Sequence, residues 1–228
     1  MGRPFRAAYV AAAAATVFGA LTGRDRWQWA AKPLLMPLLA ADVLHGGEAA
    51  AGERRVLLGA LGAATVGDVL LIDPDDDRRL VAGASAFAVM QTGYAALWWR
   101  AGARPRPAVV VPRVAAWLGA GLLLRAKAPK LAVPLSAYGA TLGTAAVLAS
   151  DPALAPGAKN VAGLNLPSRD PRSRLGVAAL LFTASDGLIV LRRLFARTPR
   201  SRRLTEAVIL TTYATAQYFL ADPRAHVN

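Results

Sequence analysis

Long apolar runs alternate with short charged segments along this chain of 228 residues. A helix needs about 20 mostly apolar residues to cross the hydrocarbon core of a bilayer, and a helix satisfies its own backbone hydrogen bonds there. We therefore interpret each run as one transmembrane helix. The eight runs cover residues 4–21, 30–44, 56–72, 80–99, 108–124, 131–150, 175–191 and 204–221. They leave no room for a soluble domain, so we predict an all-α fold, in which residues 1–228 form a single polytopic bundle of about eight transmembrane helices, arranged as two four-helix halves.

The charged residues lie almost entirely between these runs. The formal net charge is +13, which in a soluble protein would suggest nucleic-acid binding. Here the basic residues flank apolar runs, where they meet anionic lipid head groups, and the chain has no basic stripe with interleaved aromatic residues. We expect membrane lipid, and no nucleic acid, as the partner of these charges. Lys and Arg are nearly balanced between the two sides of the predicted bundle, so the positive-inside rule selects no orientation.

Residues that commonly hold metal ions or cofactors are scarce. The chain contains no cysteine, and its two histidines, His45 and His226, lie outside the predicted helices. Structural zinc sites, thiol catalysis and His-ligated metal centres need such side chains in a shared interior position. We therefore predict no metal and no cofactor.

Two segments allow more than one interpretation. The first run follows a basic start and is rich in alanine, as in a signal peptide, but the apolar runs after it favour an uncleaved first helix. We expect a multi-pass protein of the bacterial cell membrane. Residues 151–174, rich in Pro, Gly and Asn, either lie along the membrane interface, fold over the bundle, or form a plain loop.

Two acidic residues, Asp68 and Asp186, lie inside apolar runs. The octets around them, TVGDVLLI and TASDGLIV, share the pattern Thr, any residue, small residue, Asp, any residue, Leu and two aliphatic residues. This match suggests that the third and seventh helices are equivalent, which would bring both carboxyl groups to a similar depth. A carboxylate inside a membrane costs at least about 2.5–3.5 kcal/mol, so it usually faces an internal cavity. Two neighbouring acids suit general acid–base catalysis; alternatively, they form structural hydrogen bonds between helices.

Further polar residues are candidates for substrate binding. Lys32 opens a short helix interrupted by prolines, on the same side of the membrane as the two acids, where it could bind a substrate phosphate, pair with an Asp or extend to the head groups. The other candidates lie inside apolar runs and are Gln91, Tyr94, Tyr138, Tyr213 and Gln217. Each could instead only join helices. Arg113 and Glu206 lie near the ends of their runs, so we expect them to reach the interface rather than a site.

The motifs around these residues occur in a defined order along nearly the whole chain. They are KPLLMP from Lys32, GDVL from Gly67, Tyr138, SDGL from Ser185, and Tyr213 with Gln217 and Tyr218. This ordered set resembles the YhhN-like lysoplasmalogenase family. The chain departs from the family pattern in two places: it has Gln91 where a His is expected, and VLRR at residues 190–193 where Asn commonly precedes Arg.

The resemblance implies a membrane hydrolase that cleaves the vinyl ether bond of a lysoplasmalogen, giving a fatty aldehyde and a glycerophospho head group. It also implies that Asp68 and Asp186 are the catalytic pair and that no metal takes part. Hydrolysis of a vinyl ether requires protonation of its β-carbon, and water then attacks the resulting oxocarbenium ion. One carboxylic acid can supply the proton while a second carboxylate stabilises the cation and activates water. We expect Lys32 to hold the phosphate of the lysophospholipid substrate, with apolar helix faces around its alkenyl chain.

Two other functions fit the same residues. In a proton- or cation-coupled transporter of small molecules, the two acids would bind the coupling ion, and an aqueous path would reach both membrane faces. In a non-catalytic membrane scaffold, the acids would only pair helices. The true lipid substrate, its head group and the oligomeric state stay open at this stage.

Overall fold

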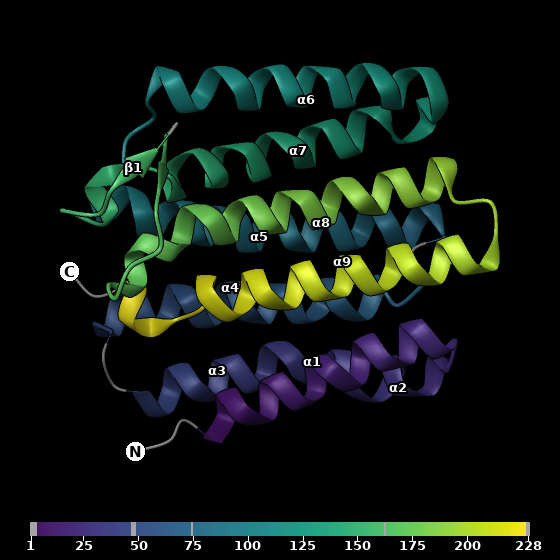
Figure 1. Ribbon diagram of the computed structural model, residues 1–228, viewed down its shortest axis with the longest axis horizontal. Coiled ribbons are helices and arrows are strands. Elements are labelled where there is room, and N and C mark those ends of the chain that lie inside the picture. Colours follow the sequence, from purple (N-terminus) through teal and green to yellow (C-terminus); the bar gives the residue numbers. More distant parts are fainter. Residues whose placement is uncertain (1–3, 47–48, 74, 162, 227–228) are drawn as a thin grey trace.

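The computed structural model describes residues 4–46, 49–73, 75–161 and 163–226. Within these ranges, seven long helices lie side by side in one bundle (Figure 1). They are α1 (Pro4–Thr22), α4 (Ala51–Leu70), α5 (Asp77–Arg100), α6 (Pro107–Lys127), α7 (Pro129–Ala149), α8 (Leu175–Phe195) and α9 (Pro199–Leu220). The shorter helices α2 (Asp25–Ala31) and α3 (Leu35–Gly46) are joined by the 3-10 turn η1 (Lys32–Leu34), and together they form the eighth helical segment of the bundle. The prediction of an all-α bundle is confirmed.

The outer surface of the bundle suits a lipid environment. Among the described residues, five helices are long and apolar enough to cross a membrane: α1, α5, α6, α7 and α8 with the turn before it. Large apolar side chains cover the outside of α6 and α7, where Val111, Leu122 and Val133 are 66%, 70% and 79% exposed. Water would penalise such a surface, whereas hydrocarbon does not. The chain is an integral membrane protein.

Several helices extend beyond the apolar runs that predicted them. Helix α4 begins at Ala51 and α9 at Pro199, about one turn before the corresponding runs, because charged residues at a helix end can reach the interface while the backbone stays helical. The start of α9 is fixed by a capping box, in which the side chain of Thr198 accepts from Ser201 N–H and the side chain of Ser201 accepts from Thr198 N–H.

The second predicted helix is broken, because Pro33 has no N–H to donate to the preceding turn. Helix α2 ends at Ala31, and the backbone N–H of Leu35 donates to the carbonyl of Lys32 before α3 begins. The break turns Lys32 into the bundle, where it is only 5% exposed.

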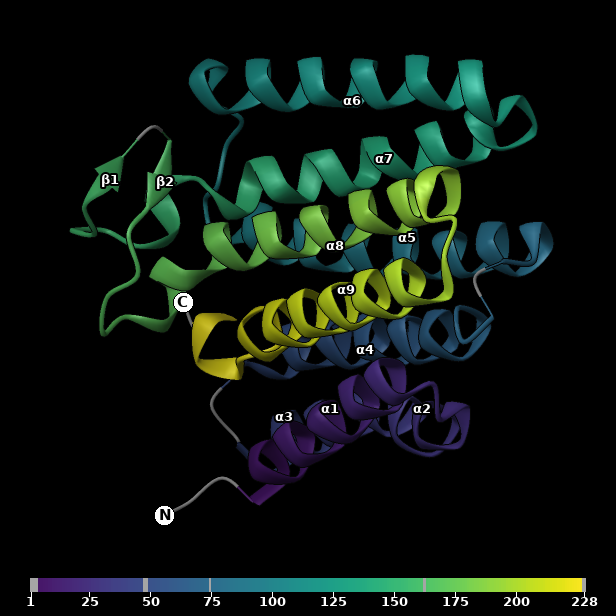
Figure 2. The same ribbon diagram turned by 45° about the vertical axis from the view of Figure 1, so that its right-hand side comes forward.

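Counting α2 and α3 as one segment, successive helices run in opposite directions, so α4 and α8 run in the same direction (Figure 1). Helix α1 begins at the end of the bundle where α9 ends. The pairs α3–α4 and α7–α8, and likewise α4–α5 and α8–α9, contact each other as two equivalent halves would. The strongest contacts between the halves, α5–α7 and α1–α9, are not equivalent, so the halves pack asymmetrically. Figure 2 shows α1, α2 and α3 along one edge and α6 along the other.

The connector between α7 and α8 is folded rather than a plain loop. It contains the turns η2 (Pro152–Leu154) and η3 (Pro171–Arg174) and an antiparallel hairpin of β1 (Asn160–Val161) and β2 (Leu164–Asn165). The side chain of Asn165 donates to the carbonyl of Asp151 at 3.2 Å, and the hairpin lies beside the ends of α7 and α8 (Figure 1).

A buried ion cluster joins α1, α3 and the end of α9. The Nε of Arg6 donates to Oδ2 of Asp42 at 2.8 Å, and its Nη2 lies 3.6 Å from Oδ1 of Asp222. The Arg6 guanidinium also lies over the ring of Tyr218, 4.5 Å from its centroid. Buried charges are stable only when they are paired in this way, so the cluster fixes the N-terminal helix to the bundle.

Candidate active site

Two cavities share a wall inside the bundle. The larger, about 320 Å³, lies mainly between α5, α6, α7 and α8 and is almost entirely apolar. The smaller, about 30 Å³, lies between η1, α4, α8 and α9. The polar residues that line the smaller cavity are Lys32, Asp68, Ser185, Asp186, Arg192, Glu206 and Tyr213. Asp186 lines both cavities, as do the apolar residues Leu71, Phe87 and Ile189.

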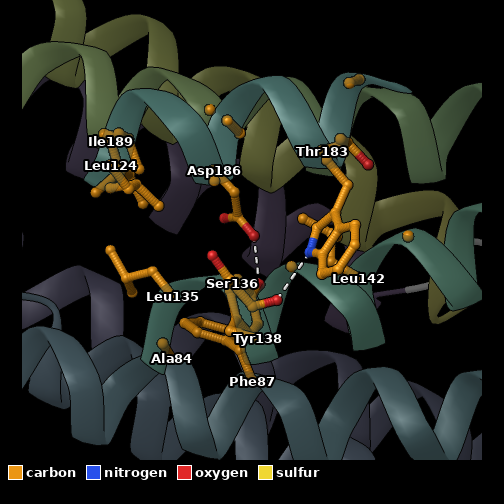
Figure 3. Close-up of a pocket in the computed structure, with 18 of the residues that line it drawn as sticks. Ala84, Phe87, Leu124, Leu135, Ser136, Tyr138, Leu142, Thr183, Asp186 and Ile189 are labelled. Atoms are coloured by element: carbon orange, nitrogen blue, oxygen red, sulfur yellow. Dashed lines mark hydrogen bonds between the residues drawn. The ribbon is translucent and has the colours of Figure 1, made fainter. Parts of the chain in front are cut away.

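Asp186 lies in the middle of α8 and faces α7. Figure 3 shows its carboxyl group pointing across the larger cavity, where it accepts a hydrogen bond from the hydroxyl of Tyr138. Leu124 and Ile189 lie to one side of this contact, so the carboxyl group is surrounded mainly by apolar side chains (Figure 3). Asp186 therefore lies in the wall between the larger, apolar cavity and the smaller, polar cavity.

Asp68 lies in the last turn of α4 and is only 1% exposed. The hydroxyl of Tyr213, from α9, donates to Oδ2 of Asp68 at 2.8 Å. Lys32 lines the same cavity, and its Nζ donates to the carbonyl of Leu71 at 3.0 Å, just beyond the C-terminus of α4. A cation there is favoured by the helix dipole, and Lys32 lines the same cavity as Asp68.

The ring of Phe87 contributes to the wall between the cavities, and Gly67 allows it to lie there. A Cβ at residue 67 would lie 2.7 Å from Cε2 of Phe87, so only glycine permits this approach. The same ring meets Phe182 and Tyr213 edge to face, with centroids 5.9 and 5.8 Å apart. These contacts fix the aromatic wall beside Asp68.

Three predicted site residues, Gln91, Tyr94 and Gln217, line neither cavity. Tyr94 donates to Oε1 of Gln217 at 3.0 Å, and Nε2 of Gln217 donates to Sδ of Met90 at 3.0 Å. Gln91 is 2% exposed, and its Nε2 forms no hydrogen bond within the described part of the chain. Tyr94 and Gln217 thus join α5 to α9, and a role in substrate binding for any of the three stays a prediction.

The site also includes residues that sequence reasoning assigned elsewhere. Glu206 was expected in the head-group region but lines the polar cavity, where Oε2 lies 3.2 Å from Nε of Arg192. Arg192 lies seven residues after Ser185, two turns along the same face of α8, and this spacing could have identified it. Arg113 extends toward one end of the bundle, where it donates to Oγ of Ser150 at the C-cap of α7 at 2.8 Å, and it also lines the large cavity. The correction for Glu206 follows from helix packing, which a linear sequence does not contain.

The described residues contain no group of three or more His, Asp or Glu close enough together to hold a metal ion. The carboxyl and hydroxyl groups that line the polar cavity can transfer protons to and from a bound water or substrate.

Comparison with known families gives a match over nearly the whole chain. The model of the YhhN family matches residues 27–223, a range that contains both cavities and every site residue discussed above. No curated protein and no solved structure matches the chain.

Proposed function

Since the chain belongs to the YhhN family, which includes lysoplasmalogenases, we propose that it hydrolyses the vinyl ether bond of a lysoplasmalogen or a related lysolipid. The products would be a fatty aldehyde and a glycerophospho head group. One observation carries the proposal: Asp186 lies in the wall between an apolar and a polar cavity. The bond to be cleaved joins an apolar chain to a polar glycerol, so it needs a catalytic group at such a boundary.

The larger cavity is suited to the alkenyl chain. Its volume of about 320 Å³ is at the lower end of the range for small-molecule sites, roughly 300–1,000 Å³, and its walls are almost entirely apolar. Each buried methylene contributes about 0.8 kcal/mol, so chain binding can supply most of the affinity. The chain would thereby hold the vinyl ether beside Asp186.

We assign the role of general acid to Asp186. Its carboxylic acid donates a proton to the β-carbon of the vinyl ether, the double bond supplies the electron pair of the new C–H bond, and the ether oxygen stabilises the cation at the adjacent carbon. The hydroxyl of Tyr138 donates a hydrogen bond to the Asp186 carboxyl group. This bond orients the carboxyl group and stabilises the carboxylate that is left after proton transfer.

We assign the role of general base to Asp68. The polar cavity, at about 30 Å³, is large enough for one or two water molecules. A water there attacks the cationic carbon and gives its proton to Asp68, forming a hemiacetal. The bond from this carbon to the glycerol oxygen then breaks: the glycerol oxygen takes the proton from Asp68, and the hemiacetal hydroxyl returns a proton to Asp186. Lys32 supplies a compensating positive charge in the same cavity.

The test is aldehyde release from lysoplasmalogen by purified Asp186→Asn and Asp68→Asn variants, measured by mass spectrometry. General acid–base catalysis contributes roughly 100- to 10,000-fold, so each variant should lose at least about 100-fold in kcat. Asp25→Asn, at an exposed position of α2, serves as the matched control. Full aldehyde release by both site variants, inserted and folded like the wild type, would overturn the proposal.

The transporter alternative has less support. It needs a polar path from the cavity to both ends of the bundle. Toward the end where α5 finishes, Tyr94 and Trp98 stack with ring centroids 5.6 Å apart, and they are 0% and 1% exposed. Proton or solute flux across the membrane of proteoliposomes that contain the wild-type chain would favour the transporter over the hydrolase.

A further inference from the structure

Two arginines hold Asp75, a residue of the connector between α4 and α5. Nη1 of Arg192 lies 3.2 Å from Oδ1 of Asp75, and Nη1 of Arg202 lies 2.7 Å from Oδ2. Each carboxylate oxygen thus has its own guanidinium group. Guanidinium groups bind carboxylate and phosphate oxygens with the same geometry, so a site that accepts one anion this way can accept the other.

Arg192 connects this ion pair to the polar cavity. Its side chain is 11% exposed and lines the cavity together with Asp68 and Asp186. Glu206 lies 3.2 Å from the Nε of Arg192, on the other side of the guanidinium from the Nη1 contact with Asp75. The salt bridge to Glu206 holds the Arg192 side chain beside the cavity, while its Nη1 contacts Asp75 of the connector.

The size of the polar cavity excludes a head group from it. A volume of about 30 Å³ holds a water or two but not a phosphate ester, so a lysolipid head group must lie beyond the cavity, on the side of Arg192. Arg202 is 42% exposed and completes a pair of positive charges there. Asp75, 44% exposed, is the group that a bound phosphate would have to displace.

On the basis of the proposed function, we propose that Arg192 and Arg202 bind the phosphate of the lysolipid head group and that Asp75 occupies this site until the substrate displaces it. The neighbouring pair of Arg193 and Asp77 holds the start of α5 against α8 and does not involve the cavity. It would keep the connector attached when Asp75 is released.

Two substrates test this assignment: a lysoplasmalogen and the corresponding 1-alkenylglycerol, which lacks the phosphate. The measured quantity is kcat/KM for lysoplasmalogen divided by kcat/KM for the 1-alkenylglycerol. Because a charged hydrogen bond to the phosphate is lost, this ratio should fall roughly 10- to 100-fold in Arg192→Gln and in Arg202→Gln. Asp75→Asn, which removes the competing anion, should lower the KM for lysoplasmalogen. Arg193→Gln is the matched control and should leave the ratio at the wild-type value. An equal loss of activity on both substrates in the Arg192 and Arg202 variants would overturn the inference while leaving the proposed function intact.

A binding measurement separates this inference from the chemistry. A saturated ether lysophospholipid and the matching 1-alkylglycerol, neither of which has a vinyl ether bond, are compared as ligands by thermal shift. The proposed function would fail if the wild type released no aldehyde from either alkenyl substrate. The phosphate site would still stand if the wild type bound the phosphate-bearing ether more tightly than the 1-alkylglycerol and Arg192→Gln removed this difference. Inorganic phosphate that stabilised the protein as strongly as the lysophospholipid would overturn the assignment to a lipid head group.

Discussion

The apolar cavity predicts how chain length limits the substrate, and Gly143 offers the sharpest test. Gly143 lies on α7 and lines the cavity, and a Cβ at this position would have no atom within 4 Å. The Cβ of a larger residue therefore has open space at this position of the cavity wall. Because Leu is a better helix former than Gly by roughly 1 kcal/mol, Gly143→Leu should not destabilise α7.

The expected effect follows from the volume that the new side chain occupies. The leucine side chain adds four carbon atoms to the cavity and displaces about as many carbons of the alkenyl chain. At about 0.8 kcal/mol per methylene, the loss reaches about 3 kcal/mol, or somewhat more than 100-fold in kcat/KM for a chain that fills the cavity. A substrate shorter by about four carbons should lose only a few-fold.

The assay is aldehyde release from a series of lysoplasmalogens with graded chain lengths. Gly59→Leu is the matched control, because Gly59 is exposed on α4, has equal space for a Cβ and lines neither cavity. The length optimum should move to shorter chains only in Gly143→Leu. An unchanged chain-length profile would show that the alkenyl chain binds elsewhere.

Three further predictions concern the site and the stability of the bundle. Tyr138→Phe removes the hydrogen bond to Asp186 and should lower kcat roughly tenfold with little change in KM, measured by steady-state aldehyde release. Arg6→Gln removes the buried cation that pairs with Asp42 and lies 3.6 Å from Asp222, and it should cost about 3–5 kcal/mol of stability, seen as a lower Tm in detergent. Burial alone would raise the pKa of Asp222, but hydrogen bonds from Arg224 and the charge of Arg6 lower it to about 2. Because the folded pKa is below the ordinary value of 3.8, this stabilisation is complete above about pH 4 and disappears as the pH falls through 2, so Asp222→Asn should flatten the decline of Tm in that interval.

The fold and the two acids could be predicted because their signals are local. An apolar run of sufficient length has few alternatives to a transmembrane helix, and a carboxyl group inside such a run is costly enough to stand out, as Asp68 and Asp186 do. The inward position of Lys32 also has a local cause, the break imposed by Pro33.

The pairing of side chains could not be predicted, because it depends on which helices meet. The sequence shows that Tyr94, Tyr138 and Tyr213 lie inside apolar runs, but not that Tyr138 bonds to Asp186, Tyr213 to Asp68 and Tyr94 to a glutamine. Glu206 was misjudged for the same reason, since its place near the start of an apolar run suggests the interface until α8 brings Arg192 beside it.

The wall that Asp186 shares between the two cavities determines where the products of the proposed reaction would go. In the proposed reaction, the aldehyde would form in the apolar chamber, next to helices whose outer faces meet hydrocarbon, and the glycerophosphate would form at the charged end near water. Each product then dissolves in a different solvent, and reversal would require both to return to one carboxyl group at the same time. Partitioning of the two products between hydrocarbon and water would therefore slow the reverse reaction.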